Sequence, residues 1–370
     1  MHIKPFQAVY PSLGHIGAPD VFFDAIKEDY NEYNDSGYFE KSFQEVLYVY
    51  RIRGATRDYN GLLACVDIRD YLEGHIRQHE HTLEAKEQKQ MQLMLRRKAA
   101  VKPVLLAYQR AEPVSGWINR FMANQEPSFE ILFSAEQELH TFWEVKEIWD
   151  IQAIQALFEQ HVPNTYIADG HHRTTTTAKM YTLTQQGLLK GDYSLLLCAL
   201  FPSSDIEILD FNRVVQGLND YTPSSFMAKL SGLFDIELLP KPEKPSRKHE
   251  LTMLLGGEWY RLRWKAHFLQ EYADDPVVLD TSLLNEKVLG EILGISDIRS
   301  DQRILYVEGP KGLDGLSQKV MGRPDCVAFC LFPVQLDEMI TLADNGKMLP
   351  PKSTWFEPRM KNGVMVQVFD

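Results

Sequence analysis

The segment YIADGHHRTTTTAKMY, residues 166–181, gathers side chains that suit anion chemistry. A short apolar run ends at an Asp-Gly pair, and two histidines and an arginine follow before a helix-like stretch. The first N–H groups of a helix lack intrahelical partners and carry partial positive charge, so they attract anions. Glycine allows a ligand close to the backbone, and arginine binds phosphate through paired hydrogen bonds. The residues of this predicted phosphate-binding turn are Asp169, Gly170, His171, His172, Arg173 and Thr174.

The same turn also fits a simpler role, in which the charged cluster only caps a helix at the surface. The residue types leave both interpretations open. The threonine run, Thr174–Thr177, is less informative, since β-branched residues fit a helix poorly. The Thr174 hydroxyl is nevertheless a possible further donor to a bound anion.

A second polar cluster is LEGHIRQHEHT, residues 72–82. His75 and His79 are four residues apart and would share one face of a helix, as zinc ligands do. The run HEHTL is not the HExxH metalloprotease pattern, and spacing supplies no third ligand. A solvated polar helix start accounts better for His75 and His81. Glu80 is the chemically interesting member, because a carboxylate beside a bound phosphate can hold Mg²⁺ or act as a general base.

A third cluster is MLPPKSTWFEPR, residues 348–359. Two prolines restrict the backbone, and Lys352, Ser353 and Thr354 follow them. A lysine beside two hydroxyl groups suits an anion. The composition by itself suits an ordinary exposed tail better.

Alternating strand-like and helix-like segments predict a mixed α/β (α+β) fold that positions these clusters. Apolar runs predict strands at EVLYVYRI, GLLACVDI, VKPVLLAYQ, TYIA and YSLLLCALF, and a hairpin from FEILFS with LHTFWEV. Helical periodicity appears in residues 82–99, with Thr82 as a candidate N-cap, and in residues 150–161, with Asp150 as a candidate cap.

The later part of the chain predicts a smaller second lobe. The stretch KPEKPSRKHE, residues 241–250, is charged and contains two prolines, which suggests a boundary or an exposed loop. A hairpin is expected to turn at Gly256 and Gly257. The expected domains are a core over residues 1–220 that contains the predicted phosphate-binding turn, an α+β lobe over 221–335, and a C-terminal helix and tail over 336–370 that returns to the core.

Composition narrows the functional classes. The chain has 370 residues and a formal net charge of −12, with no long basic run, which disfavours nucleic-acid binding. Its longest strongly apolar run, LLLCALF, is far shorter than the roughly 20 residues that span a bilayer. The four cysteines form no CxxC pair and are expected to be buried and reduced. The start of the chain has no apolar signal-peptide region, so the chain is expected to be cytoplasmic. Its expected partner is a small-molecule substrate, and no membrane partner is expected.

Several motifs resemble the DUF1015 family of bacterial proteins, in the same order along the chain. These are KPF, GHIRQHEHT, KPVLLAY, ADGHHR, LDTSLLNEKVL and MLPPKSTWFEPR, and the resemblance spans nearly the whole chain, from Pro5 to Gly363. The family in turn is distantly similar to the ParB/sulfiredoxin fold and its free serine kinases, whose Asp-Gly-His-x-Arg loop holds nucleotide phosphates. The resemblance implies a ParB/sulfiredoxin-like core here. His171 replaces the cysteine of the sulfiredoxin loop, so sulfiredoxin activity is not expected.

Two departures from the family pattern are visible. The segment DFNRVV keeps Arg213 but has Asn212 where the family usually has histidine, which could tune or weaken a site. Arg359 replaces the usual lysine near the end and keeps the charge.

The resemblance implies a nucleotide-dependent phosphotransferase that acts on a small hydroxyl metabolite, serine or a relative. ATP or ADP would be the donor, with Mg²⁺ as cofactor. Phosphoryl transfer depends mostly on positioning and charge neutralisation. Gly170 to Arg173 would hold the phosphates, and Glu80 or Asp169 would bind Mg²⁺ or take the acceptor proton. The remaining pocket residues would be His79, Thr82, Arg213, Lys352, Ser353 and Thr354.

The alternative is a binding module that senses a nucleotide through the same loop, without turnover, and passes the signal to a partner. A structural protein without a ligand would leave the His-His-Arg turn unexplained. The sequence does not decide the nucleotide, the acceptor or the oligomeric state.

Overall fold

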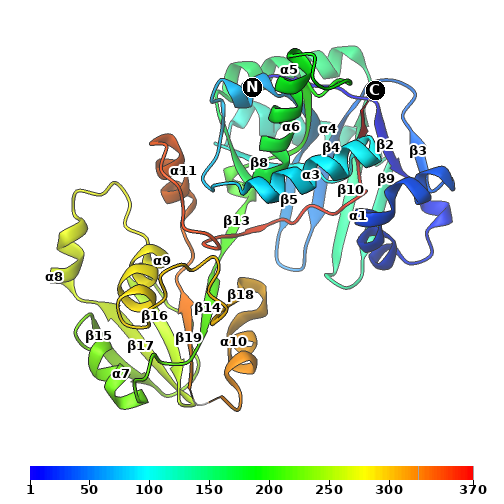
Figure 1. Ribbon diagram of the computed structural model, residues 1–370. Helices are drawn as coiled ribbons and strands as arrows, with labels where there is room; N and C mark the ends of the chain where they lie inside the picture. The colour runs from blue at the N-terminus through cyan, green and yellow to red at the C-terminus, as the bar shows by residue number, and fades with distance from the viewer. Residues whose placement is uncertain (324, 370) are drawn as a thin grey trace. The chain divides into compact units, whose positions relative to one another are not determined.

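A computed structural model describes residues 1–323 and 325–369 (Figure 1). It has a mixed α/β architecture, as predicted, and divides into two compact units. The first unit contains Met1–Glu207 together with the chain from Pro358 onward, and the second contains Ile208–Glu357. Within the described ranges, no helix combines the length and the apolar character needed to cross a membrane.

A nine-stranded sheet forms the frame of the first unit, in the order β6-β11-β8-β12-β5-β4-β10-β9, with β1 paired to β5. Its strands are β1 Ile3–Lys4, β4 Leu47–Arg53, β5 Asp58–Asp67, β6 Ile76–Arg77, β8 Val104–Tyr108, β9 Phe129–Phe133, β10 Glu138–Val145, β11 Thr165–Asp169 and β12 Leu195–Pro202. Most neighbours are antiparallel, but β11 runs parallel to β6, and β12 runs parallel to β8. The apolar runs identified in the sequence supply β4, β5, β8, β11 and β12, and the predicted hairpin is β9 with β10.

The helices of the first unit are α1 Pro19–Asp35, α2 Arg69–Leu72, α3 Glu84–Arg97, α4 Glu112–Asn124, α5 Ile148–His161 and α6 His171–Gln185. The long helices α3 and α6 pack along one another, and α4 packs against α5 (Figure 1). Two predicted caps are wrong. The N-cap of α3 is Leu83 rather than Thr82, and the N-cap of α5 is Glu147, which places Asp150 inside the first turn.

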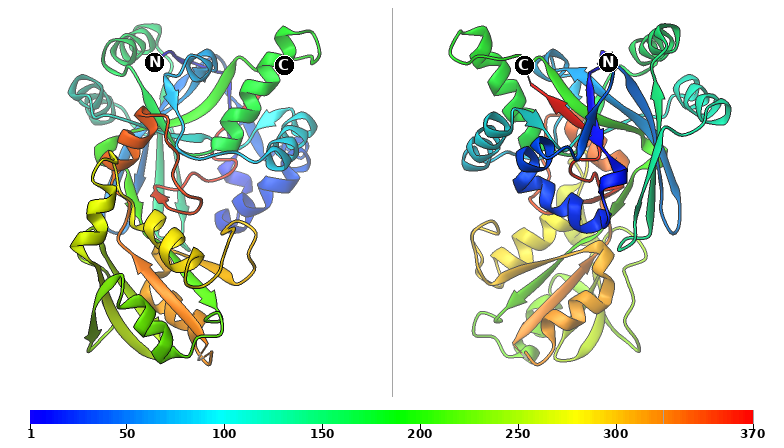
Figure 2. Two further views of the ribbon diagram at one scale, coloured as in Figure 1. Left: turned by 60° about the vertical axis from the view of Figure 1, so that its left-hand side comes forward. Right: turned by 90° about the vertical axis from the view of Figure 1, so that its right-hand side faces the viewer.

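The C-terminal tail returns to the first unit, as expected. Strand β21 (Val366–Val368) pairs with β2 (Ala8–Pro11) and with β7 (Ala99–Ala100), and β3 (Phe39–Lys41) completes this four-stranded sheet. Figure 2 shows the last strand, in red, beside the blue N-terminal strands. The end of the chain thereby closes over the segment between α3 and β8.

A six-stranded antiparallel sheet forms the second unit, in the order β15-β17-β16-β19-β14-β18. Its strands are β14 Phe211–Gln216, β15 Phe234–Leu239, β16 Glu250–Leu255, β17 Glu258–Trp264, β18 Ile304–Glu308 and β19 Cys326–Leu331. Strands β13 (Glu207–Leu209) and β20 (Trp355–Glu357) pair separately. The helices of the second unit are α7 Pro223–Leu230, α8 Ala266–Leu269, α9 Asp280–Leu283, a π-helical continuation Leu284–Gly290, α10 Gly312–Val320 and α11 Leu336–Asp344.

The 3₁₀ turns in the described residues of both units are Leu13–His15, Ser203–Asp205, Gln270–Tyr272 and Gly309–Lys311.

The observed division of the chain differs from the domain limits expected at residues 220 and 335. Strand β14 pairs with β18 and β19, so the chain enters the second unit well before residue 220. Helix α11 also belongs to the second unit, where Glu338 forms an ion pair with Lys248. The charged stretch 241–250 is no domain boundary, because it joins β15 to β16 of one sheet.

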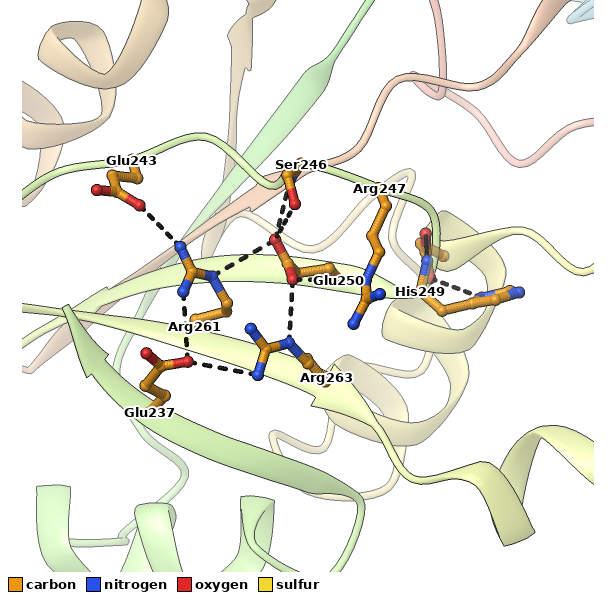
Figure 3. A network of polar contacts seen from close by, with 9 residues as sticks. Glu237, Glu243, Ser246, Arg247, His249, Glu250, Arg261 and Arg263 are labelled. Atoms are coloured by element: carbon orange, nitrogen blue, oxygen red, sulfur yellow. Dashed lines mark hydrogen bonds and ion pairs between the residues drawn. The ribbon is translucent and has the colours of Figure 1, made fainter.

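Charged side chains of the second unit converge on a buried carboxylate at the start of β16 (Figure 3). Glu250 is 1% exposed and accepts hydrogen bonds from the Ser246 backbone N–H at 2.9 Å and from Arg263 Nε at 3.2 Å. Arg261 Nε lies 3.5 Å from Glu250 Oε1, the oxygen that accepts from Ser246. Burial alone would raise the pKa of Glu250, but these donors and cations together lower it.

Removing this charge should destabilise the second unit. Glu250→Gln keeps the shape but removes the buried charge that the partly exposed Arg261 and Arg263 neutralise, so urea unfolding at pH 7 should show a loss of about 1–3 kcal/mol. Because the folded-state pKa is lowered, the contribution of Glu250 is present above the ordinary value of 4.5 and disappears as pH falls through the folded-state pKa. The wild type and the variant should therefore converge in acid. Glu258→Gln, at an exposed position on the same hairpin, is the control, and equal losses in the two variants would contradict the assignment.

Candidate functional site

The predicted turn lies where strand β11, which is next to the edge strand β6 in the sheet of the first unit, passes into helix α6. The strand ends at Asp169, Gly170 is the N-cap with φ of +114°, and the helix begins at His171, three residues earlier than the sequence suggested. A φ of this sign favours glycine. The sharp reversal places the first helical N–H groups at the end of β11, and His171, His172 and Arg173 form the first turn of α6.

An ion cluster holds this turn. Arg173 Nη2 donates to Asp169 Oδ2 at 2.9 Å and to the Pro103 carbonyl at 3.3 Å. Lys102 Nζ lies 3.6 Å from the same carboxylate oxygen. Burial alone would raise the pKa of Asp169, but the charges of Arg173, Lys102 and Arg359 hold it well below its ordinary range. Asp169 is therefore a permanent anion and a weak proton acceptor.

Gly170 is needed for this ion cluster as well as for the backbone turn. A Cβ atom at this position would lie 2.8 Å from Arg173 Nη2 and 3.0 Å from Val104 Cγ2. The Arg173 guanidinium group packs across the turn and occupies the space that a side chain at position 170 would need.

The two histidines join the turn to the segment that precedes α3. The Nε2 atom of His171 accepts from the His79 backbone N–H at 3.4 Å, and the Nε2 atom of His172 accepts from the Leu83 N–H at 3.1 Å. Burial lowers the pKa of His171 to about 4 and also lowers the pKa of His172. Both rings are neutral at pH 7, so each retains a proton on Nδ1 while Nε2 accepts.

This arrangement brings Glu80 to the turn. Glu80 Oε2 lies 4.0 Å from His171 Nδ1, and the Glu80 side chain is 43% exposed. His79 is buried, its ring packs edge-on against His171 with centroids 4.5 Å apart, and burial holds its pKa well below the ordinary value. Two segments about 90 residues apart in the chain therefore meet, and they place one partly exposed carboxylate beside the start of α6.

The predicted threonines bond within the protein. Thr82 Oγ1 donates to Glu87, which also forms an ion pair with Lys179 of α6. Thr174 Oγ1 donates to the Gly170 carbonyl at 3.2 Å, and its side chain is buried. Such bonding to the preceding turn satisfies hydroxyl groups inside a helix, which explains how α6 accommodates the threonine run.

The other predicted site residues belong to the second unit. Arg213 is fully buried, donates through Nη1 to the Phe211 carbonyl, and stacks over the Tyr306 ring at 5.5 Å. Burial lowers its pKa to about 10, so it remains a cation at neutral pH. Lys352 Nζ lies 5.2 Å from the Phe211 ring centroid.

The neighbours of these residues have local roles. Ser353 is buried and donates to the Pro350 carbonyl at 2.6 Å, and Thr354 follows it. Asn212, at the position where the family usually has histidine, is also buried, and its side chain accepts from the Leu331 N–H at 2.9 Å. Arg213 and Lys352 are thus grouped around Phe211.

The family model described as "Protein of unknown function (DUF1015)" matches residues 12–282 of the chain. This chain belongs to the DUF1015 family.

Solved structures with a related arrangement share little sequence with this DUF1015 chain. C-terminally truncated SbnI from Staphylococcus aureus is 12% identical, with a TM-score of 0.41, and the match covers 81% of this chain and 85% of SbnI. A free serine kinase in complex with AMP is 13% identical, with a TM-score of 0.38, and 82% and 92% are covered. A conserved hypothetical protein from Pyrococcus furiosus is 12% identical, with a TM-score of 0.38, and 83% and 95% are covered. No curated protein matched the sequence.

Metal ligands are sparse in the described part of this DUF1015 chain. No group of three or more His, Cys, Asp or Glu side chains there has an arrangement that could hold a metal ion. The segment 78–83 is not helical, so the helix face that His75 and His79 were expected to share does not form. The four cysteines are free and buried, as predicted.

Two cations at the turn were not assigned to the site from sequence. Lys102 precedes β8, and Arg359 lies in the returning tail, yet both act on Asp169. Lys102 and Arg359 belong to the motifs KPVLLAY and FEPR, but only the three-dimensional arrangement of the DUF1015 chain relates these motifs to the turn.

We predict that the ion cluster depends on Gly170. Gly170→Ala should cost about 1–2 kcal/mol in backbone strain alone and more through displacement of Arg173, which for a unit of this size lowers the melting temperature by about 2–4 °C per kcal/mol. Gly187→Ala is the matched control, because that glycine also has positive φ but an added Cβ would contact nothing. Equal melting temperatures for the two variants would show that Arg173 does not need the open face of Gly170.

Proposed function

We propose that this DUF1015 protein is a nucleotide-dependent phosphotransferase that acts on a small hydroxyl metabolite, serine or a relative. ATP or ADP would donate the phosphoryl group, with its phosphates at the start of α6. The proposal rests on one observation, that two carboxylates in different environments lie at the same turn. Asp169 is neutralised by cations, whereas Glu80 approaches the same turn and stays partly exposed.

The cations at the turn support phosphate binding. Arg173 and Lys102 flank Asp169, so two positive charges face one negative charge, and Arg359 adds a third. The helix N-terminus contributes further positive potential. Transfer of a phosphoryl group requires mainly this kind of positioning and charge neutralisation.

The neutral histidines support the same assignment in a different way. Because Nε2 of each ring accepts from the 79–83 backbone, the rings hold the Glu80 segment against α6. Their protonated Nδ1 atoms remain available as neutral donors. In this proposal His171 and His172 position Glu80 and donate to ligand oxygens without adding charge.

Glu80 is proposed as the general base. A hydroxyl group is a poor nucleophile until a base removes its proton in the transition state. Asp169 is a poor candidate for that role because its low pKa disfavours proton uptake. Mg²⁺ in phosphotransferases is commonly held by one or two carboxylates together with substrate phosphates. Glu80 would be the main protein ligand for Mg²⁺, because Asp169 Oδ2 already contacts Arg173 and Lys102, and bound Mg²⁺ would neutralise phosphate charge.

The decisive variant is Glu80→Gln, which keeps the shape and removes the charge. Phosphoryl transfer should fall by about 100-fold or more, since general-base assistance contributes about 10²- to 10⁴-fold, while nucleotide affinity should change little. The assay incubates the protein with ATP, ADP or CTP, Mg²⁺ and a pool of hydroxyl metabolites, and detects phosphorylated products by mass spectrometry. Glu84→Gln, an exposed carboxylate at the start of α3, is the control.

The outcomes separate the possible roles. Full activity of Glu80→Gln would exclude Glu80 as the base, and a joint loss of nucleotide binding and activity would indicate a Mg²⁺ ligand. Tight nucleotide binding by the wild type without any product would replace the phosphotransferase with a non-catalytic nucleotide sensor.

A further inference from the structure

A cavity of about 310 Å³ lies within the first unit, on another side of the turn from the histidines. Helices α3 and α6, strand β12 and the returning tail enclose it. From α6 it is lined by Arg173 and Thr177, four residues apart and therefore on one helix face. Neither His171 nor His172 lines it.

The charged residues lining this cavity are all cations. They are Lys27, Arg97, Lys102 and Arg173. Asp169 offsets part of the charge of Lys102 and Arg173, but no residue that lines the cavity is an Asp or Glu. Burial lowers the pKa of Lys102 to about 8, which leaves it mostly protonated at neutral pH. The cavity therefore presents positive potential to any ligand that enters it.

Arg97 is the most unusual of these residues. It is only 7% exposed, and its Nε and Nη2 atoms are buried without a hydrogen-bond partner in the described structure. Buried polar groups are nearly always hydrogen-bonded, and a buried guanidinium without partners is costly. A ligand with anionic oxygens in the cavity would supply the partners that the protein lacks.

The rest of the cavity restricts the kind of ligand. Gln90 and Asn362 add polar contacts, whereas Met94, Leu196 and Phe369 form apolar wall. The volume exceeds that of a bare phosphate ion, and it lies within the range of small-molecule sites. A phosphate group at the cations, attached to a small organic part against the apolar wall, matches both features.

We propose that this cavity binds a phosphate monoester of a small organic molecule, with Arg97 as its main ligand. Arg173 then contacts both this ligand and the ion cluster of the turn, so that occupancy of the cavity and the order of the turn are coupled. The inference goes beyond the proposed phosphoryl transfer and does not depend on it, because binding here requires no turnover.

The test compares Arg97→Met with Arg96→Met. Met fills similar space without charge, and Arg96 is the adjacent cation, with an exposed side chain outside the cavity. Glycerol phosphate and inorganic phosphate are the probes, and chloride at equal ionic strength is the control for screening. Melting temperature and calorimetric titration are measured for each protein.

The wild type should be stabilised by glycerol phosphate more than by inorganic phosphate, and not by chloride. Arg97→Met should melt at or above the wild-type temperature without ligand, because it removes a buried guanidinium group whose Nε and Nη2 atoms have no hydrogen-bond partner. The same variant should bind glycerol phosphate at least about tenfold more weakly. Arg96→Met should leave melting and binding as in the wild type.

The opposite pattern would overturn the inference. A lower melting temperature for ligand-free Arg97→Met, with unchanged affinity, would make Arg97 a structural residue. The inference would also be overturned if the wild type did not bind glycerol phosphate at millimolar concentration. If Arg97→Met does not fold, Lys27→Gln, an exposed cation lining the cavity, should weaken binding about two- to fivefold, and unchanged binding would overturn the inference. Binding that persists in Glu80→Gln would separate this site from phosphoryl transfer.

Discussion

The contact of Asp169 with Arg173 and Lys102 is the interaction on which the rest of the site depends. It draws the Arg173 side chain across Gly170, and it can do so only because that position has no Cβ. It also holds Asp169 ionised, which disqualifies this carboxylate as a base and leaves that role to another residue. A single ion cluster thereby sets both the shape of the turn and the division of chemical roles around it.

Helix α6 presents different chemistry on different faces. One face meets the segment before α3 through His171 and His172, and it meets α3 itself through the Lys179–Glu87 ion pair. Another face, with Arg173 and Thr177, lines the cationic cavity. The hydroxyl groups of the threonine run bond within the helix, to α3, or to Tyr71 of α2, which lets the helix be buried on several sides. The position of α6 between these two environments explains why so polar a sequence forms a central helix.

The sequence predicted what short-range patterns encode. Apolar runs identified β4, β5 and β12, and the Asp-Gly pair located the turn. Features that depend on distant partners were missed or wrong. The position of Thr82 predicts a helix cap, but its hydroxyl group donates to Glu87, which also forms an ion pair with Lys179 of α6. Arg97 ends an ordinary amphipathic helix in the sequence, and distant segments, including the returning tail with Gln367 and Phe369, line the cavity around it. Helices α1 and α4 were not predicted, and each begins with proline in its first turn and lacks a side-chain cap.

The most direct test of the account is hydrogen–deuterium exchange of the full chain with and without ADP and Mg²⁺. The central claim is that nucleotide phosphates bind at the start of α6. Slower exchange is expected in peptides that cover residues 79–83 and 169–177, since a ligand there would order both segments that the histidines join. Binding of ADP with unchanged exchange in both segments, and protection only elsewhere in the chain, would contradict it.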